Sequence, residues 1–230
     1  MRKSSLFFAP VLILFLTLIR SSSASPCYGT NMPQKNKFFG GVQSYMIFER
    51  DLEDEFGKVE SQQEFIMLSY GVFDWLAIDL KAGFGGVEAR SVAGVKTEYD
   101  QSFSGGYGLR WKFFERDNWK AVAGFQHISV HPQSTHVGND KNKAILDDWQ
   151  VSLLASYTWA KFTPYLGTRW SRTDYIHTVN DDRKRKMSNL TRDIGMVLGM
   201  DFALTEKIWL NLEGSAFDNE SLAASVNYRF

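Results

Sequence analysis

The last stretch of the chain constrains the fold most, because its residues alternate between two faces with a strict period of two. One face carries Leu222, Ala224, Val226, Tyr228 and Phe230, and the other carries Ala223, Ser225, Asn227 and Arg229. A period of two indicates a β-strand with one apolar and one polar side. The final residue is an aromatic inside this pattern, whereas the ends of soluble domains usually fray in water. Residues 208–216 alternate in the same way, so the chain is predicted to end in a β-hairpin.

The same alternation recurs along the chain and predicts ten antiparallel strands. They are expected at about residues 39–49, 65–72, 76–84, 107–113, 119–130, 149–159, 165–171, 194–202, 208–216 and 222–230. Short turns near Asp74, Asp117, Lys161 and Glu206 alternate with longer polar loops at 51–57, 88–96, 132–147, 180–192 and 218–220. Transmembrane barrels have an even number of strands, short periplasmic turns and longer exterior loops. The pattern therefore predicts an all-β, ten-stranded transmembrane barrel.

The N-terminus has the order of a secretory signal peptide. Arg2 and Lys3 precede an apolar run at residues 6–19, and small residues follow at 21–25. This order predicts cleavage after Ala24. The expected domains are a signal peptide at 1–24, a loose periplasmic lead-in at 25–38 and the barrel at 39–230. Cys27 is the single cysteine, so no internal disulfide is expected.

Charge and composition argue against binding of nucleic acid, metal ions or cofactors. Without residues 1–24 the chain keeps 23 basic and 26 acidic residues, a net charge near −3. No strong basic field points to a nucleic-acid partner. His127, His131 and His136 match no standard metal-ligand spacing, so neither a metal nor another cofactor is expected.

The terminal strand with Tyr228 and Phe230 resembles the targeting strand that the barrel assembly machinery recognises in bacterial outer-membrane proteins. The chain as a whole resembles the small outer-membrane β-barrel superfamily that includes opacity- and OmpA-like proteins. This resemblance implies location in the outer membrane, with outer-membrane lipids and lipopolysaccharide as partners. Aromatic side chains favour the membrane interface, and a lower girdle is expected from Trp75, Trp119, Trp159 and Tyr228.

A soluble lipocalin-like barrel or sandwich is the alternative architecture. In such a domain the apolar faces would form the core and the polar faces would be solvated. The polar faces here are rich in Gly and Ser, whereas a solvated face is more often rich in Lys, Glu and Thr. This composition favours a narrow, filled lumen.

With the apolar faces toward lipid, charged residues point into the lumen. The expected polar network contains Asp79, Lys81, Arg110, Arg169, Asp201 and Glu213. A barrel of this size is largely filled by side chains, and buried charges must pair. The main expectation is a non-enzymatic structural or surface barrel with a filled polar lumen. A narrow pore biased toward anions is an alternative.

A second alternative is an enzyme. His127 and Ser129 lie on one strand face near the exterior end, in phase with lipid-facing residues. The pair resembles the His-x-Ser motif of the lipid A deacylases, outer-membrane barrels whose Ser–His–acid site faces the outer leaflet. The resemblance implies His127 as general base, Ser129 as nucleophile and a carboxylate that orients the histidine. Asp147 or Asp148, at the start of the next strand, could supply that carboxylate.

Overall fold

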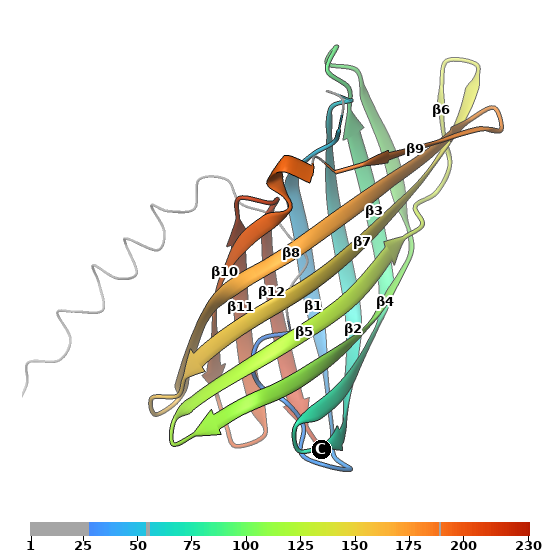
Figure 1. Cartoon of the computed structure of the whole chain (residues 1–230). Helices are drawn as coiled ribbons and strands as arrows, with labels where there is room; N and C mark the ends of the chain where they lie inside the picture. The colour runs from blue at the N-terminus through green and yellow to red at the C-terminus, as the bar shows by residue number, and fades with distance from the viewer. Residues whose placement is uncertain (1–27, 54–55, 189) are drawn as a thin grey trace, which may run out of the picture.

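The computed structural model describes residues 28–53, 56–188 and 190–230, and ten long strands of this region form a closed antiparallel barrel (Figure 1). The barrel strands are β1 (Phe38–Asp51), β2 (Lys58–Phe73), β3 (Leu76–Arg90), β4 (Lys96–Arg116), β5 (Trp119–Val130), β7 (Asp140–Tyr157), β8 (Phe162–Val179), β10 (Ile194–Ala203), β11 (Ile208–Ala216) and β12 (Glu220–Arg229). Two short strands, β6 (Thr135–Val137) and β9 (Asp182–Met187), and a 3₁₀ turn, η1 (Leu190–Arg192), lie in the exterior loops.

The ring closes where the last strand pairs with the first. Phe39 of β1 lies opposite Arg229 of β12, and β7 pairs with β8 to complete the circle. Every barrel strand therefore has a neighbour on both sides. This arrangement satisfies the backbone hydrogen bonds of the wall inside the protein, as a membrane-spanning sheet requires. The prediction of a ten-stranded antiparallel barrel is confirmed.

Side chains alternate between lipid and lumen along each strand. On the outside, Ile66 is 71% exposed and Phe84 is 64% exposed, although both are large and apolar. On the inside, Asp79 is fully buried. The four girdle residues Trp75, Trp119, Trp159 and Tyr228 are all exposed, at the end of the barrel that carries the short turns. The outer wall thus presents an apolar belt with aromatic rings at its lower edge.

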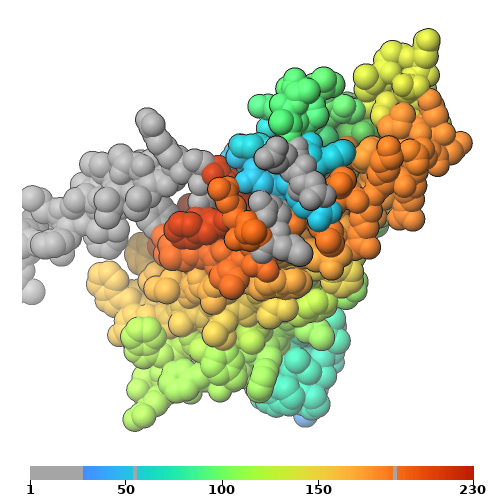
Figure 2. Space-filling model, turned by 45° about the horizontal axis from the view of Figure 1, so that its top comes forward, coloured from blue at the N-terminus to red at the C-terminus, as the bar shows by residue number. Residues whose placement is uncertain are grey.

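Two expected loops are partly built from strand. Residues 132–147 contain β6 and the first part of β7, and residues 180–192 contain β9 and η1. These segments are rich in polar residues, and the short apolar run at 144–146 lies between charged ones, so alternation predicts no strand there. Their backbones nevertheless pair, since β6 hydrogen-bonds to β7 and β9 to β8. Residues 135–146 and 174–187 form a four-stranded flap that projects beyond the barrel end (Figures 1 and 2).

The segment expected as a loose periplasmic lead-in takes another course. In its described part residues 34–37 are exposed at the short-turn end, and residues 28–33 enter the lumen, where Thr30 is 1% exposed and donates a hydrogen bond to Ser156 of β7. Buried donors and acceptors on the wall hold residues 28–33 there, so this part is neither loose nor outside the barrel. The expected signal peptide and Cys27 lie outside the described residues.

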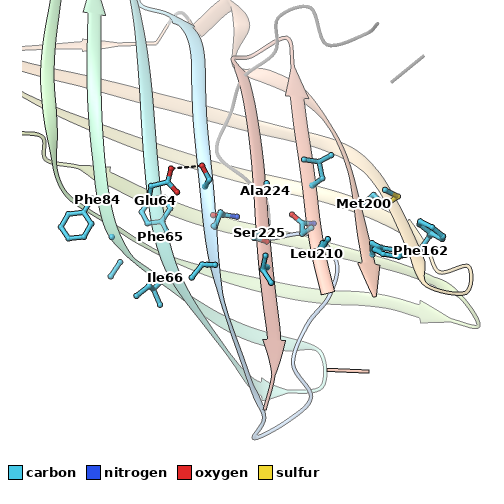
Figure 3. A pocket seen from close by; sticks show the side chains of 18 residues that line it. Glu64, Phe65, Ile66, Phe84, Phe162, Met200, Leu210, Ala224 and Ser225 are labelled. Carbon is cyan, nitrogen blue, oxygen red and sulfur yellow. Dashed lines mark hydrogen bonds between the residues drawn. The ribbon is translucent and has the colours of Figure 1, made fainter. Parts of the chain in front are cut away.

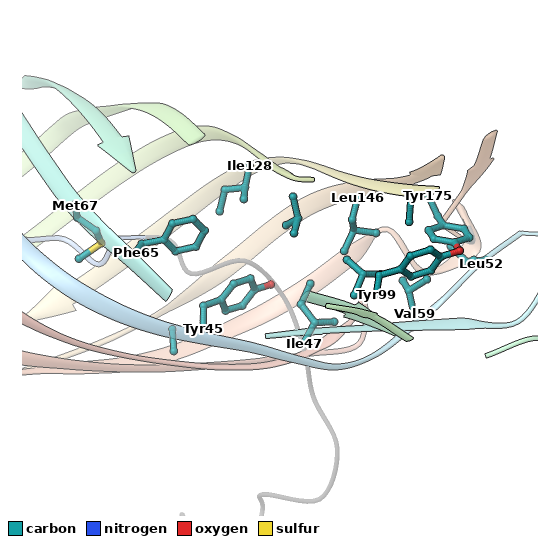
Figure 4. Close-up of a cluster of buried hydrophobic side chains, with 14 residues drawn as sticks. Tyr45, Ile47, Leu52, Val59, Phe65, Met67, Tyr99, Ile128, Leu146 and Tyr175 are labelled. Carbon is teal, nitrogen blue, oxygen red and sulfur yellow. The ribbon is translucent and has the colours of Figure 1, made fainter. Parts of the chain in front are cut away.

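The lumen is only partly polar. A cluster of buried apolar side chains fills its exterior half, and includes Tyr45, Phe65, Tyr99, Ile128 and Tyr175 (Figure 4). The expected filled polar lumen is thus filled in part by apolar side chains. An inward position in a narrow barrel is dry once neighbouring side chains fill it, and it then accepts an apolar residue. The part of the chain that the structure describes holds no helix long and apolar enough to cross a membrane.

Candidate functional site

The first polar cluster of the lumen is built around Arg110 of β4. Its guanidinium binds Asp79 of β3 through two hydrogen bonds of 2.8 Å, and it also donates to Ser69 at 3.0 Å. Both charged side chains are at most 2% exposed. A buried charge pair of this kind holds only when further hydrogen bonds satisfy the remaining donors and acceptors.

A second polar cluster joins strands far apart in sequence at the exterior side. Arg169 of β8 binds Asp218 through two hydrogen bonds of 2.8 Å. Arg50 of β1 donates to the carbonyl oxygen of Ser171 at 3.0 Å and lies 3.7 Å from Asp218. Arg50 and Asp218 are not among the lumen residues predicted from the sequence, because each lies where a predicted strand meets a loop and alternation assigns no face there. Only the curvature of the barrel brings them together.

The remaining expected lumen residues are also buried. Asp201 accepts hydrogen bonds from Asn211 at 2.8 Å and Asn31 at 3.0 Å. Glu213 accepts one from the Tyr165 hydroxyl at 2.7 Å. Lys81 is 4% exposed and lies over the ring of Tyr28. The structure thus places all six expected residues inside the barrel, but divides them among separate clusters.

At the exterior end of the barrel, the loop after β1 is hydrogen-bonded to the end of β9. The Glu53 amide donates to the Met187 carbonyl at 2.8 Å, and the Met187 amide donates to the Glu53 carboxylate at 3.0 Å. Beside them Leu52 forms a bridge to Ser188 and belongs to the apolar cluster. The loop after β1 is therefore fastened to the end of β9 above the packed exterior half of the lumen.

A different group of polar side chains lies on the outer, lipid-facing wall. Register pairing places Ser129 of β5 opposite Asp147 of β7, and Asp147 opposite Asp174 of β8. These three residues share the outward side with His127 and His131. The next residue, Asp148, is buried in the lumen and accepts a hydrogen bond from Thr173. Of the two carboxylates expected near Ser129, Asp147 is therefore the one on its face.

Ser129 is hydrogen-bonded on two sides. Its Oγ lies 2.5 Å from Asp147 Oδ1 and 2.8 Å from His131 Nε2. A hydroxyl has one proton, so when it donates to the carboxylate, the Nε2–H of His131 donates to Oγ. The imidazole in contact with Ser129 is thus His131, two residues after the serine. His127 had been expected in that place.

His127 lies nearby in a different environment. Its Nε2 is 3.7 Å from Asp147 Oδ1 and has no hydrogen-bond partner among the described residues. Its ring packs on Trp149, with centroids 3.9 Å apart, and faces Tyr107 at 5.5 Å. The aromatic contacts fix the ring beside the carboxylate. The structure therefore assembles one serine, one aspartate and two histidines on the membrane-facing surface.

Basic side chains border this group on the flap side. Asp174 binds Arg172 at 3.1 Å and also binds Arg185 of β9. The β9 strand carries four consecutive basic residues, 183–186. On the opposite side Ser129 is paired with Gly105, and the ring of Phe103 lies 3.0 Å from the place that a Cβ of this glycine would take. Ser129 thus lies between a charged border and an apolar one.

A shallow groove of about 870 Å³ crosses the outer wall elsewhere, lined mostly by apolar residues of β1, β2, β3, β10, β11 and β12 (Figure 3). At its edge Ser44 donates a hydrogen bond of 2.9 Å to Glu64. This is a second lipid-facing serine–carboxylate pair, and no histidine is hydrogen-bonded to it in the described chain. It therefore offers an internal comparison for the Ser129 group.

Among residues 28–53, 56–188 and 190–230, no three His, Cys, Asp or Glu side chains are grouped to hold a metal ion. The chemistry available to the Ser129 group is that of a hydroxyl, two imidazoles and a carboxylate.

Comparisons with known proteins bear on the fold. No protein-family model and no curated protein matches the chain. Among solved structures, the transport unit of the autotransporter AIDA-I from Escherichia coli is 11% identical, with 97% of each chain covered and a TM-score of 0.50. An outer membrane channel from Pseudomonas putida F1 is 12% identical over 90% of this chain and 100% of its own, with a TM-score of 0.47. The outer membrane protease OmpT from Escherichia coli is 10% identical over 84% and 97%, with a TM-score of 0.45.

At these identities the likeness to AIDA-I shows the fold alone, which agrees with the closed ring of strands and the exposed apolar belt. The chain is a closed antiparallel barrel of ten strands and has the fold of bacterial outer-membrane β-barrels.

Proposed function

We propose that the protein is an outer-membrane hydrolase that cleaves an acyl ester of a lipid in the outer leaflet, with Ser129 as nucleophile. The observation that carries this proposal is the contact of Ser129 Oγ with both Asp147 and His131, at 2.5 and 2.8 Å, on the lipid-facing wall. A nucleophilic serine requires an adjacent base and a third group that orients the pair. An acyl chain in the membrane reaches this wall directly.

The proposed roles follow from the distances. In the reacting tautomer His131 carries its proton on Nδ1, so the Ser129 hydroxyl turns from Asp147 to the unprotonated Nε2, which takes its proton as Oγ attacks the ester carbonyl carbon. His131 then protonates the departing alcohol oxygen, and the ester C–O bond breaks. Water, deprotonated by the same imidazole, releases the fatty acid from Ser129. Asp147 stabilises the imidazolium, and His127 Nε2, which has no hydrogen-bond partner in the described part of the chain, supplies a donor beside the developing charge.

The substrate class is proposed from the surroundings and from the resemblance to lipid A deacylases. Arg172 and Arg185, together with the basic residues 183–186, stand where the phosphates of an anionic glycolipid would lie. Lipopolysaccharide is therefore the proposed substrate and lipid partner. The barrel assembly machinery is the proposed second partner, through Tyr228 and Phe230, which are 41% and 66% exposed on the last strand.

The experiment is acyl release from lipid A by refolded protein in lipopolysaccharide-containing vesicles, followed by mass spectrometry. Wild type should remove an acyl chain. Ser129→Ala and His131→Ala should each lower the rate at least about 100-fold, the range expected for a nucleophile or general base. Ser44→Ala is the matched control, because it removes the lipid-facing serine that contacts only a carboxylate and should keep full activity.

A parallel assay with acyl-labelled phospholipid separates the two lipid classes. Activity that survives Ser129→Ala would contradict the assignment of the nucleophile. A larger loss of activity in His127→Ala than in His131→Ala would identify His127, the histidine of the His-x-Ser motif, as the general base.

The second candidate is the non-enzymatic surface barrel. It is favoured by the resting hydrogen bond of Ser129, in which the hydroxyl donates to a carboxylate and not to an imidazole. Intact lipid A in the presence of folded wild-type protein would support this candidate. The packed lumen also supports a barrel that does not conduct, in preference to an anion-biased pore.

A further inference from the structure

The N-terminal segment, residues 28–37, runs from the short-turn end of the barrel, where residues 34–37 are exposed, into the lumen. The Asn36 amide donates to the Gly71 carbonyl at 2.7 Å, and the Lys35 amide donates to Asp74 Oδ1 at 3.0 Å. These contacts place residues 35–37 at the turn between β2 and β3. A Cβ on Gly71 would lie 2.1 Å from the carbonyl oxygen of Gln34, so the wall is shaped for the close passage of this backbone.

Deeper in the lumen, Arg110 grips the backbone of the segment. Its Nη1 donates to the carbonyl oxygens of Tyr28 and Asn31, at 3.1 and 2.5 Å. The Tyr28 ring lies 3.9 Å from Lys81 Nζ and 5.3 Å from the Arg110 guanidinium carbon, in cation–π contact with both. The Arg110 guanidinium therefore binds Asp79 of the barrel wall and the backbone of the segment at the same time.

Two side chains of the segment also form hydrogen bonds with the barrel wall. Thr30 donates to Ser156 of β7 at 2.8 Å, and Asn31 donates to Asp201 of β10 at 3.0 Å. The contacts of residues 28–31 described above come from four strands of the barrel, namely β3, β4, β7 and β10. They are mainly hydrogen bonds and cation–π contacts, in contrast to the apolar packing of the exterior half.

The space that holds the segment faces the short-turn end. The apolar cluster and the tie between Glu53 and Met187 close the opposite half. A polar cavity of about 170 Å³ remains beside Asn31, with Lys120, Asp201 and Arg229 in its lining. The segment thus occupies the inner part of a polar vestibule whose mouth lies on the periplasmic side.

We infer that the periplasmic half of the lumen is a peptide-binding site, and that residues 28–34 are its built-in ligand, a plug that can leave and return. The ligand class is a short polar peptide whose carbonyl oxygens accept hydrogen bonds from a guanidinium that is already paired with a buried carboxylate. This site is independent of the Ser129 group, because it lies inside the wall and Ser129 lies outside.

The first test traps the plug in the complete protein. Thr30→Cys and Ser156→Cys are combined with Cys27→Ser, since the two native hydroxyl oxygens are 2.8 Å apart and a disulfide needs close β-carbons. Oxidation in the membrane should give a disulfide within the chain, visible as a changed mobility without reductant. A folded, heat-modifiable barrel that forms no such disulfide would overturn the inference.

The second test measures release. In the Cys27→Ser background, Thr30→Cys alone should react slowly with a thiol reagent applied from the periplasmic side. Adding Arg110→Met should raise the labelling rate at least about tenfold. The matched control is Arg169→Met, which breaks the buried pair with Asp218 at the exterior side of the lumen. Equal acceleration by both substitutions would mean general loosening, and would contradict a specific plug.

The third test supplies the ligand in trans. A variant lacking residues 25–34 is checked for heat-modifiable migration and then mixed with a peptide of residues 25–37 that carries Cys27→Ser. The unfolding temperature should rise in a saturable way, whereas a scrambled peptide should have no effect. A folded deletion variant that ignores the peptide would overturn the binding site. If the deletion prevents folding, the ratio of the labelling rates of Arg110→Met and Arg169→Met tests the plug instead, and a ratio near one would contradict it.

Discussion

At the scale of single residues, small side chains decide how the lumen is filled. Gly199 of β10 points inward, and a Cβ at this position would lie 2.2 Å from the ring of Tyr165. That tyrosine is 2% exposed and is hydrogen-bonded to Glu213 and Asn211. A glycine here is therefore required for close approach of a buried ring, and the phenol in turn orients two polar side chains.

Gly199→Ala should destabilise the barrel by about 1–3 kcal/mol, because extra volume in a packed interior forces neighbours out of their places. Denaturant unfolding followed by tryptophan fluorescence measures the change in the free energy of unfolding. Gly214→Ala is the control, since the nearest atom to its added Cβ would be 3.8 Å away. Equal effects of the two substitutions would show that the Tyr165 contact does not set the cost.

At the scale of elements, strands continue into the exterior where they no longer face lipid. The flap carries His177 on β8, packed between Tyr175 and Phe56 with centroid distances of 5.5 and 5.3 Å. Burial, and then the positive charge of Lys184, lower the pKa of His177 below its usual value, while Asp182 opposes and Lys186 reinforces this effect. Its Nδ1 is buried without a partner among the described residues, so protonation adds an unsatisfied donor.

The flap should therefore loosen as the pH falls. Because the folded pKa is the lower one, the unfolded flap binds the proton more readily. Stability is present above the ordinary histidine pKa of about 6.5 and decreases as the pH falls through that value toward the folded pKa. Amide hydrogen exchange of β9, corrected for intrinsic rates, should show faster opening at pH 5.5 than at pH 7.5. His177→Phe should remove this dependence, whereas His136→Phe, at an exposed position, should keep it.

At the scale of the whole molecule, the barrel is inverted relative to a soluble protein. Apolar side chains form the outer belt, while charges and one apolar cluster fill the inside. Tryptophans occur on both sides. Trp119 is 53% exposed on the outer wall, and Trp209 is 5% exposed inside, with its ring against Phe39 and Arg229.

Brominated lipids should distinguish these two positions, because bromine quenches tryptophans that touch acyl chains. Trp119→Phe should lower the quenched fraction of fluorescence in vesicles, and Trp209→Phe should raise it. The opposite pair of changes would contradict the orientation of the wall. In detergent without bromine, Trp119→Phe should have the same free energy of unfolding as the wild type. Trp209→Phe should be less stable, because it loses buried packing.

The sequence alone predicted much of this architecture, for a local reason. Alternation with a period of two assigns each strand residue to a face, so Asp79 and Arg110 could be placed inside, and Trp75 and Tyr228 outside. Short turns and strand parity then fixed the number of strands and the closure. Adjacent strands also placed Ser129 near Asp147, because neighbours across a hairpin follow from the chain order.

Only the tertiary structure decided which residues meet across the lumen. Arg50 and Asp218 are far apart in sequence, as are Thr30 and Ser156, and no periodic pattern links them. Their distances depend on register, tilt and curvature summed around the ring, which alternation does not specify. The same holds for the apolar filling of the exterior half and for the entry of residues 28–33 into the barrel. Alternation determines the faces of the wall, and closure of the ring determines the contacts inside it.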